Sequence, residues 1–314
     1  RHVPVIDRYV SDIAARVGRI TRPDGSTLKV VYDCGNGAAA LVAPQLMTAL
    51  GIDGIGLFTE SDGTFPNHHP DPTVPENLED CIGTVQASGA EIGVAFDGDA
   101  DRIGVVDRDG RIIWGDHILI LYARDVLART GAGQPIIFDV KCSQALMDGI
   151  EKAGGVPVMW KTGHSLIKDK MKELHAPIAG EMSGHMFFTE SFYGHDDALY
   201  AAARLLRIIA NSGMRLDELL ADVPPFVSTP ELRIDTDEES KFAIVARAAT
   251  HFKATHEVIE VDGVRVLFGD GWGLLRASNT QPVIVARFEA STIERLAEIR
   301  GVMEGWLHTQ GVSL

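Results

Sequence analysis

A turn with three alternating aspartates between two apolar runs constrains this chain more than any other stretch. Asp97, Asp99 and Asp101 form the turn, and the apolar residues 92–96 and 103–106 on either side predict two buried strands. Three carboxylates so close together repel one another unless a cation lies between them, and hard oxygen ligands select Mg²⁺ or Ca²⁺. The turn therefore predicts a divalent metal site at the end of a strand, of the kind used in phosphate chemistry.

Two other interpretations of the turn are weaker. An EF-hand loop also begins Asp-x-Asp-x-Asp, but it needs glycine at its sixth position and glutamate at its twelfth, where this chain has Arg102 and Arg108. A solvated hairpin turn would also be rich in aspartate and glycine, although three alternating carboxylates between strongly apolar strands favour a metal site. Arg102 adds a fixed positive charge beside the cluster and could hold an anionic ligand.

The composition of the 314 residues is that of a globular protein, and the charge excludes some partners. Hydrophobic residues make up 45% of the chain, and its length suffices for two or three domains. The formal net charge of −15 argues against nucleic acid or an anionic membrane as the main partner. No apolar run approaches the roughly 18 residues of a membrane-spanning helix. The three cysteines are widely spaced and form no Cys-x-x-Cys pair, so we expect neither a disulfide framework nor a zinc site, and a cytoplasmic location.

A repeated pattern of elements predicts two tandem α/β domains. In each copy a strand ends in an aspartate, Asp33 in the first and Asp139 in the second, and leads through a loop of small residues to a helix, a glycine and another strand. A Pro-rich linker then precedes a smaller part with a hairpin and further strands between helices. We predict two similar α/β domains with mixed sheets, at 1–111 and 112–223, followed by an α+β domain with an antiparallel sheet at 224–314.

Three further loops carry groups suited to binding or catalysis. The loop 180–185 offers a glutamate, a serine and a histidine, and a carboxylate can hold a sugar by accepting from its vicinal hydroxyls. The loop 276–280 offers an arginine, two hydroxyls and an amide, which suit a phosphate dianion. His164 and Lys141, each in a loop after a strand, are candidate general acids or bases.

Blander interpretations of these loops remain open. Hydroxyls and asparagine are normal in hairpin turns, so the loop 276–280 alone is weak evidence for phosphate binding. A Ser-His-Asp hydrolase is a competing idea, because His164 and Ser165 are adjacent. However, the chain has no Gly-x-Ser-x-Gly elbow.

In their order along the chain, the motifs resemble those of the α-D-phosphohexomutase superfamily, in particular the bacterial phosphomannomutase/phosphoglucomutase group. The matching stretches are Asp97-Gly98-Asp99-Ala100-Asp101-Arg102, Thr162-Gly163-His164-Ser165, Gly180-Glu181-Met182-Ser183-Gly184-His185 and Arg276-Ala277-Ser278-Asn279-Thr280. Ala100 stands where the family usually has glycine, and Met182 favours the hexose enzymes over the phosphoglucosamine mutases.

The resemblance implies an enzyme that interconverts hexose 1-phosphate and hexose 6-phosphate, of glucose or mannose, through a bisphosphorylated sugar and an active-site phosphoserine. It assigns Mg²⁺ to Asp97, Asp99 and Asp101, and assigns proton transfer and positioning to Lys141, His164 and Arg102. The substrate-binding residues that it implies are Glu181, Ser183, His185, Arg276, Ser278, Asn279 and Thr280. It also implies activation of the intact enzyme by glucose 1,6-bisphosphate, and a monomer.

One family motif has no counterpart in residues 1–314. The family's first domain carries a Thr-Ala-Ser-His-Asn-Pro type loop whose serine is phosphorylated, and no such loop occurs here. We therefore expect the chain to correspond to domains two, three and four of the family, and to be inactive alone. A non-catalytic sugar-phosphate-binding fragment and a Mg²⁺-dependent sugar phosphatase are the alternative functions.

Overall fold

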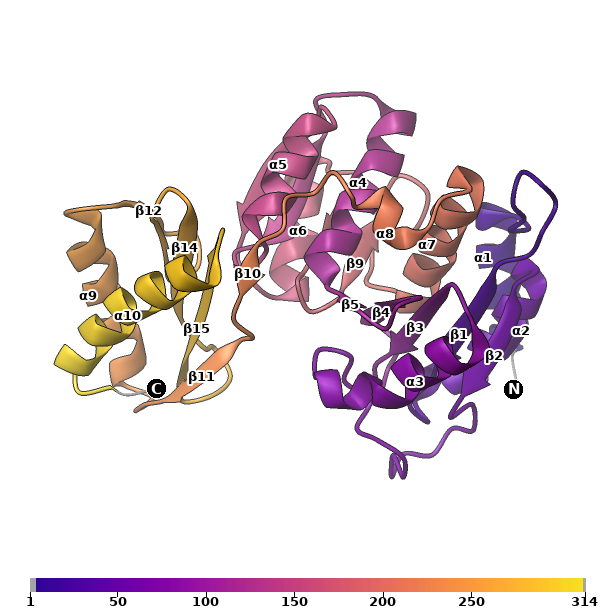
Figure 1. Ribbon diagram of the computed structural model, residues 1–314, viewed down its shortest axis with the longest axis horizontal. Coiled ribbons are helices and arrows are strands. Elements are labelled where there is room, and N and C mark those ends of the chain that lie inside the picture. Colours follow the sequence, from indigo (N-terminus) through magenta and orange to yellow (C-terminus); the bar gives the residue numbers. More distant parts are fainter. Residues whose placement is uncertain (1–3, 313–314) are drawn as a thin grey trace. The chain divides into compact units, whose positions relative to one another are not determined.

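The computed structural model describes residues 4–312, and its chain divides into two compact units (Figure 1). Unit 1 contains the chain up to Phe138 together with Leu146–Val158 and Gly163–Val223. Unit 2 contains the chain from Pro224 onward together with the short segments Asp139–Ala145 and Met159–Thr162. The two short segments each include the end of a strand in the second α/β sheet, so unit 2 takes in loops that the sequence alone assigns to the second domain.

The first sheet of unit 1 has the strand order β2-β1-β3-β4-β5. Its strands are β1 (Lys29–Asp33), β2 (Asp53–Leu57), β3 (Ile92–Phe96), β4 (Ile103–Asp107) and β5 (Ile112–Ile113). β1 pairs in parallel with β2 and β3, whereas β3 and β4 form an antiparallel hairpin. Every residue of β3 and β4 is buried, which confirms the two buried strands predicted around the aspartate turn.

Three helices accompany this sheet. They are α1 (Val5–Val17), α2 (Ala43–Leu50) and α3 (Glu79–Ser88), with short 3-10 turns at Ala38–Leu41 and Pro75–Leu78. The sequence patterns of 38–50 and 76–88 each predict one helix, and the structure has a 3-10 turn at the start of each stretch. A proline stands at the start of both α2 and the second 3-10 turn, where its missing N–H costs no helical hydrogen bond.

The second sheet repeats the first with the order β7-β6-β8-β9. Its strands are β6 (Pro135–Asp139), β7 (Val156–Trp160), β8 (Ile178–Gly180) and β9 (Met186–Phe188). β6 and β8 are parallel, and β8 and β9 form an antiparallel hairpin, as β3 and β4 do in the first sheet. The predicted repeat of one α/β topology with mixed sheets is therefore confirmed.

Five helices belong to the second domain. They are α4 (Gly115–Thr130), α5 (Gln144–Lys152), α6 (His164–Leu174), α7 (Ala198–Ser212) and α8 (Leu216–Leu219). The sequence patterns of 117–129, 144–153 and 197–211 predict the helices α4, α5 and α7, but no pattern in the sequence predicts α6 or α8. α7 packs against α1, against β3 and β4 of the first sheet and against β9 of the second, which makes the two α/β domains parts of one unit.

The C-terminal part of unit 2 is an antiparallel sheet covered by two helices (Figure 1). The strands are β10 (Val227–Ser228), β11 (Leu232–Asp235), β12 (Glu257–Ile259), β13 (Val264–Leu267), β14 (Gly271–Ala277) and β15 (Val283–Ala290), and the helices are α9 (Ser240–Lys253) and α10 (Ile293–Thr309). The core of this domain lies between helices and sheet and includes Phe252, Phe288 and Met303. The predicted α+β domain is confirmed.

Candidate functional site

The aspartate turn between β3 and β4 brings three carboxylates together. Asp97, Asp99 and Asp101 each offer an oxygen, and these oxygens lie within 4.8 Å of one another. Oδ1 of buried Asp97 accepts the backbone N–H groups of Asp101, at 2.9 Å, and of Arg102, at 3.0 Å, which fixes the turn. Ala100 adopts the left-handed conformation, with φ at 65°, which costs an alanine roughly 1 kcal/mol relative to glycine. The turn is therefore held in a strained shape that gathers the carboxylates.

Arg102 is bound by two carboxylates of the first domain. Its Nε lies 2.7 Å from Oδ2 of Asp97, and its Nη1 lies 3.0 Å from Oδ1 of Asp71. Burial raises the pKa of Asp97 despite the opposing effect of Arg102. Sequence reasoning missed Asp71, which lies in a Pro-rich loop far from the turn along the chain.

The β8–β9 hairpin carries the predicted sugar loop, and the structure brings its three polar residues together. Glu181 is buried, and its Oε1 accepts the N–H of Gly163 at 2.6 Å. Its Oε2 lies 3.0 Å from Nδ1 of His185, and Oγ of Ser183 lies 2.9 Å from the same nitrogen. The loop therefore presents a carboxylate, a hydroxyl and an imidazole as one cluster.

The two equivalent hairpins are joined through their backbones within unit 1. The N–H of Ile103 donates to the carbonyl of Gly184 at 3.2 Å, and Arg102 and His185 form an antiparallel bridge. Gly184 has φ at 98°, and a Cβ there would lie 2.4 Å from the carbonyl oxygen of Ile103, so only glycine fits this junction. The predicted metal loop and the predicted sugar loop are consequently joined within unit 1.

His185 links the two loops electrostatically. Its Nε2 lies 3.3 Å from Oδ1 of Asp101, on the side opposite its contact with Glu181. Burial opposes its charge, but the hydrogen bonds to Asp101 and Glu181 outweigh burial and raise the pKa of His185 to about 9. The ring therefore carries a positive charge between two carboxylates at neutral pH when no metal is bound.

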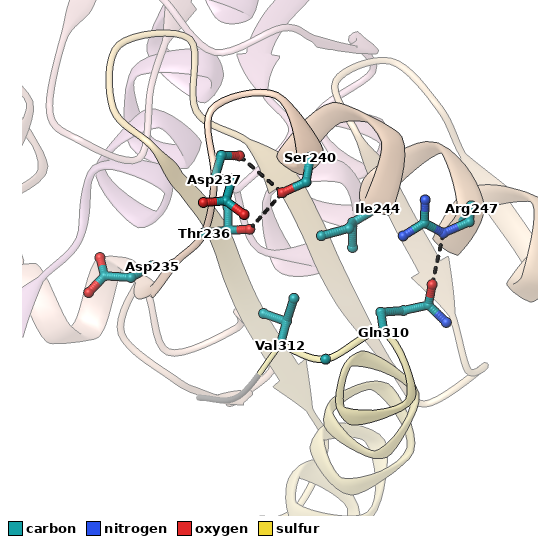
Figure 2. A pocket seen from close by; sticks show the side chains of 9 residues that line it. Asp235, Thr236, Asp237, Ser240, Ile244, Arg247, Gln310 and Val312 are labelled. Atoms are coloured by element: carbon teal, nitrogen blue, oxygen red, sulfur yellow. Dashed lines mark hydrogen bonds between the residues drawn. The ribbon is translucent and has the colours of Figure 1, made fainter.

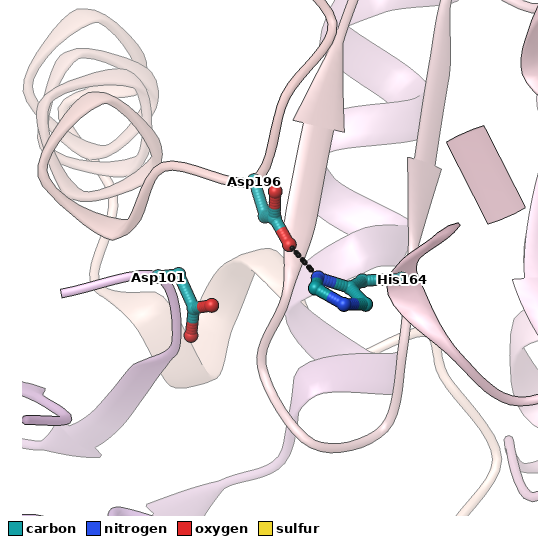
Figure 3. Close-up of side chains that lie close together, drawn as sticks. All are labelled: Asp101, His164 and Asp196. Carbon is teal, nitrogen blue, oxygen red and sulfur yellow. Dashed lines mark hydrogen bonds and ion pairs between the residues drawn. The ribbon is translucent and has the colours of Figure 1, made fainter. Parts of the chain in front are cut away.

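The sequence predicts that His164 lies in a loop, but in the structure it is the first residue of α6. Figure 3 shows its imidazole directed toward Asp196, with Nδ1 2.9 Å from Oδ2 of that carboxylate. Nζ of Lys168 binds the other oxygen of Asp196 at 3.0 Å. Asp101, His164 and Asp196 also offer three ligand atoms within 4.8 Å of one another, but the Lys168 ammonium already neutralises Asp196. This geometry favours an oriented histidine over a second metal site.

The predicted phosphate loop follows β14 in unit 2. Arg276 is mostly buried at the end of the strand, and its Nε donates to Oδ2 of Asp262. Oγ of Ser278 accepts the N–H groups of Thr280, at 3.3 Å, and Gln281, at 3.2 Å, which fixes the turn. Asn279 and Thr280 are exposed. In the sequence, Asp262-Gly263 indicates only the centre of a hairpin and gives Asp262 no functional role.

Lys141 also belongs to unit 2, where carboxylates hold its side chain. Its Nζ lies 3.0 Å from Oε2 of Glu231 and 3.7 Å from Oδ2 of Asp139. The same oxygen of Asp139 accepts a hydrogen bond from Oγ1 of Thr162 at 3.2 Å, and the N–H of Thr162 donates to Asp262. Lys141 is therefore connected through side chains and one backbone group to the aspartate that binds Arg276.

Two buried arginines of the C-terminal sheet anchor the Lys141 loop. Arg265, fully buried with its guanidinium carbon 3.7 Å from the ring centroid of Trp272, donates to the carbonyls of Val140, at 2.9 Å, and Cys142, at 2.7 Å. Arg287 donates to the carbonyl of Lys141 itself. Burial lowers the pKa of Arg265 to about 10, so it remains charged. These bonds explain why the segment Asp139–Ala145 packs with unit 2.

A separate pocket of about 580 Å³ lies between the start of α9 and the end of α10 (Figure 2). Its lining includes Asp235, Ser240, Arg247 and Gln310, and Nε of Arg247 donates to Oε1 of Gln310 at 2.8 Å. The residues that line it include none of those predicted to bind or react.

The donor set of the aspartate turn fits Mg²⁺. It consists of carboxylate oxygens, which that ion prefers, and the turn has more carboxylates than the single guanidinium of Arg102 can neutralise. Asp99 is exposed and Asp101 half-buried, so a hydrated ion can reach them. The site residues lie in two groups, one in each unit.

Family comparisons match most of the chain. The model of phosphoglucomutase/phosphomannomutase alpha/beta/alpha domain II matches residues 7–110, that of alpha/beta/alpha domain III matches 114–226, and that of the C-terminal domain matches 231–304. The chain belongs to the phosphoglucomutase/phosphomannomutase family.

Individual relatives agree with this assignment. The phosphomannomutase/phosphoglucomutase of Pseudomonas putida is 52% identical over 96% of this chain and 64% of its own length. That of Pseudomonas aeruginosa PAO1 is 49% identical over 99% of this chain and 66% of its own length. A crystal structure of a phosphoglucomutase/phosphomannomutase family protein from Burkholderia thailandensis superimposes with a TM-score of 0.88 at 48% identity, over 97% of this chain and 64% of that one. The chain thus spans just under two thirds of the length of these relatives.

Two further findings concern the setting of the protein. Among residues 4–312, no helix is both long enough and apolar enough to cross a membrane. Cys34, Cys81 and Cys142 belong to no disulfide, and each of them is buried.

Proposed function

We propose that the protein to which this chain belongs is a phosphohexomutase that interconverts hexose 1-phosphate and hexose 6-phosphate of glucose or mannose. The observation that carries the proposal is the backbone junction in unit 1. It places a carboxylate triad suited to Mg²⁺ beside the Glu181, Ser183 and His185 cluster. The names of the relatives support the same activity.

Unit 1 would bind the metal and the sugar. Asp97, Asp99 and Asp101 would hold Mg²⁺, which when bound would neutralise charge that develops on a transferred phosphoryl group. Glu181 would accept hydrogen bonds from vicinal sugar hydroxyls, and Ser183 would complete that contact.

The remaining unit 1 residues would position groups and move protons. His185 would line the sugar site, and Arg102 would orient Asp97 and neutralise part of the charge of the turn. The contact between Asp196 and Nδ1 of His164 orients that ring, so that Nε2 is the atom that would exchange a proton with a substrate hydroxyl.

Unit 2 would bind a phosphate group that does not react. Arg276 would supply a planar pair of N–H donors, and Ser278, Asn279 and Thr280 would complete the oxygen shell with hydroxyl, amide and backbone donors. The ammonium of Lys141, held by Glu231, would donate to a substrate oxygen.

The phosphoryl donor would be a phosphoserine, with glucose 1,6-bisphosphate as the activator of the intact enzyme. Residues 1–314 contain no Thr-Ala-Ser-His-Asn-Pro type loop, so the serine would lie outside them and the chain alone would not turn over substrate. The intact protein would act as a monomer.

A coupled assay tests the proposal. The chain is incubated with glucose 1-phosphate, Mg²⁺ and catalytic glucose 1,6-bisphosphate, alone and with the phosphoserine-bearing domain supplied, and glucose 6-phosphate and inorganic phosphate are both measured. We expect glucose 6-phosphate only when that domain is present. Full turnover by the chain alone would contradict the phosphoserine mechanism, release of inorganic phosphate would indicate a phosphatase, and binding without any turnover in both arms would indicate a binding fragment.

A further inference from the structure

Asp262 binds Arg276, the arginine that unit 2 would use to bind phosphate. It lies in the turn between β12 and β13, and its Oδ2 accepts hydrogen bonds from Nε of Arg276 and, at 3.1 Å, from the N–H of Thr162. The side chains of Asp262 and Arg276 are only 14% and 11% exposed, so solvent screens this ion pair far less than a surface pair.

The backbone enforces this contact. Gly263, the next residue, has φ at 79°, and a Cβ there would lie 2.3 Å from the carbonyl oxygen of Leu275 and 2.8 Å from Cα of Arg276. The turn therefore presses directly against β14 at the arginine. A glycine at this position lets the Asp262 carboxylate reach the Nε edge of the guanidinium.

The contact leaves the other edge of the guanidinium for a ligand. Within residues 4–312, Asp262 is the one hydrogen-bond and ion-pair partner of Arg276, and it binds Nε of the guanidinium. No hydrogen bond or ion pair within residues 4–312 uses the two terminal nitrogens of Arg276, and such a pair of nitrogens suits bidentate recognition of phosphate. An arginine held in this way loses less rotamer freedom when it binds an anion.

We propose that Asp262 is a positioning residue for phosphate recognition, which fixes the Nε edge of Arg276 and so aims its two terminal nitrogens at the anion. The same carboxylate also accepts the N–H of Thr162, within unit 2. The inference rests on the proposed phosphate-binding role of Arg276. It goes further by assigning the geometry of that arginine to a residue outside the family motif quoted above.

Removal of the Asp262 charge and loss of its positioning role would change phosphate binding in opposite directions. A carboxylate near a bound phosphate repels it, so removal of Asp262 would strengthen phosphate binding if its charge were all that mattered. A positioning role predicts that removal weakens binding, because Arg276 then samples many rotamers. The sign of the change therefore separates the two accounts.

The test measures the affinity of the chain for glucose 6-phosphate by calorimetry in wild type and four variants: Asp262→Ala, Asp262→Asn, Arg276→Ala and Glu260→Gln. Glu260→Gln is the matched control, because Glu260 lies in the same hairpin but pairs with Lys253, at 2.6 Å, instead of Arg276. Thermal unfolding and Mn²⁺ binding at the unit 1 turn are measured for each variant, as checks that the rest of the fold is intact.

We expect Asp262→Ala and Arg276→Ala each to weaken glucose 6-phosphate binding at least tenfold, with Glu260→Gln within twofold of wild type. Asp262→Asn keeps one acceptor oxygen and should bind between wild type and Asp262→Ala, a partial rescue that a general loss of stability would not give.

Two results would overturn the inference. If Arg276→Ala weakens binding but Asp262→Ala binds as tightly as wild type or more tightly, the positioning role is wrong and the proposed role of Arg276 stands. If Arg276→Ala binds glucose 6-phosphate as tightly as wild type, the positioning role of Asp262 and the phosphate-binding role of Arg276 are both wrong. Should Asp262→Ala fail to fold, Asp262→Asn decides alone: weaker binding supports the role, and equal or tighter binding contradicts it.

Discussion

The proposed metal-and-sugar site of unit 1 and the proposed phosphate loop of unit 2 are built in different ways. The unit 1 site arises where equivalent hairpins of two repeated domains meet, and backbone groups of Ile103 and Gly184 make the junction. In unit 2 one hairpin loop carries the arginine, and side chains such as Asp262 set its direction. The unit 1 region therefore depends on close backbone packing, whereas the unit 2 loop depends on single carboxylates.

The two regions also differ in the charge that they offer a ligand. In the unit 1 turn, three carboxylates face the guanidinium of Arg102 and the imidazole of His185, and the ligand that we propose for them is a cation. In unit 2, Asp262 binds Nε of Arg276, and the ligand that we propose for this arginine is an anion. Variants that break one region should therefore leave the ligand of the other region bound.

Gly184→Ala should have the largest effect. A Cβ would lie 2.4 Å from the carbonyl oxygen of Ile103, and φ at 98° disfavours alanine, so we expect a loss of about 3 kcal/mol in the free energy of unfolding measured with urea. Binding of inorganic phosphate by unit 2 should persist in the folded fraction, because the Arg276 loop lies outside unit 1.

Gly131→Ala is the matched control for this variant. Gly131 also has a positive φ, at 91°, but a Cβ there would meet no heavy atom within 4 Å, so the loss should be only about 1 kcal/mol. Equal losses in the two variants would mean that the backbone junction contributes nothing beyond the local conformational preference of glycine.

Glu231→Gln should have a smaller effect, and one that depends on pH. Burial would raise the pKa of Glu231, but Lys141 outweighs burial and lowers it below its ordinary value of 4.5. A carboxylate whose pKa is lower in the folded state stabilises the fold above its unfolded pKa, and this stabilisation disappears as the pH falls through the folded pKa.

We therefore expect wild type to exceed Glu231→Gln by about 1 kcal/mol in unfolding free energy at pH 7, with the gap closing as the pH falls below 4.5. The measurement is urea unfolding between pH 3 and pH 7, with Glu239→Gln, an exposed glutamate of the same unit, as the control. A gap that stays constant down to pH 3 would contradict the role of the Lys141 pair.

Much of the fold and the main motifs could be predicted from the sequence because they are local. The aspartate turn, its flanking strands and the strand–loop–helix repeat each lie within short stretches, and the repeat gave the shared topology of the two sheets. Helix α6 was missed because, of its eleven residues, only Ile167 and Met171 are buried, which leaves a weak apolar pattern. The periodicity of apolar residues does not distinguish the two short 3-10 turns from α-helix.

The partners of the site residues could not be predicted, because they are distant in sequence and chemically ordinary. Asp71, Asp196 and Glu231 lie 31, 32 and 90 positions from the residues that they bind. Each is an acid in a loop or at the edge of a strand, where a solvated side chain is the default expectation. Tertiary packing alone brings them to Arg102, His164 and Lys141.

The most direct test is a two-by-two binding measurement, in which Asp99→Asn and Arg276→Ala are each titrated with Mn²⁺ and with glucose 6-phosphate. Asp99 is exposed, so its replacement should leave the fold intact while it removes one metal ligand. We predict that Asp99→Asn weakens Mn²⁺ binding at least tenfold and leaves glucose 6-phosphate binding within a few-fold of wild type, with the reverse for Arg276→Ala. If either variant weakens both ligands equally, or neither, then the two regions are not separate sites for a cation and an anion.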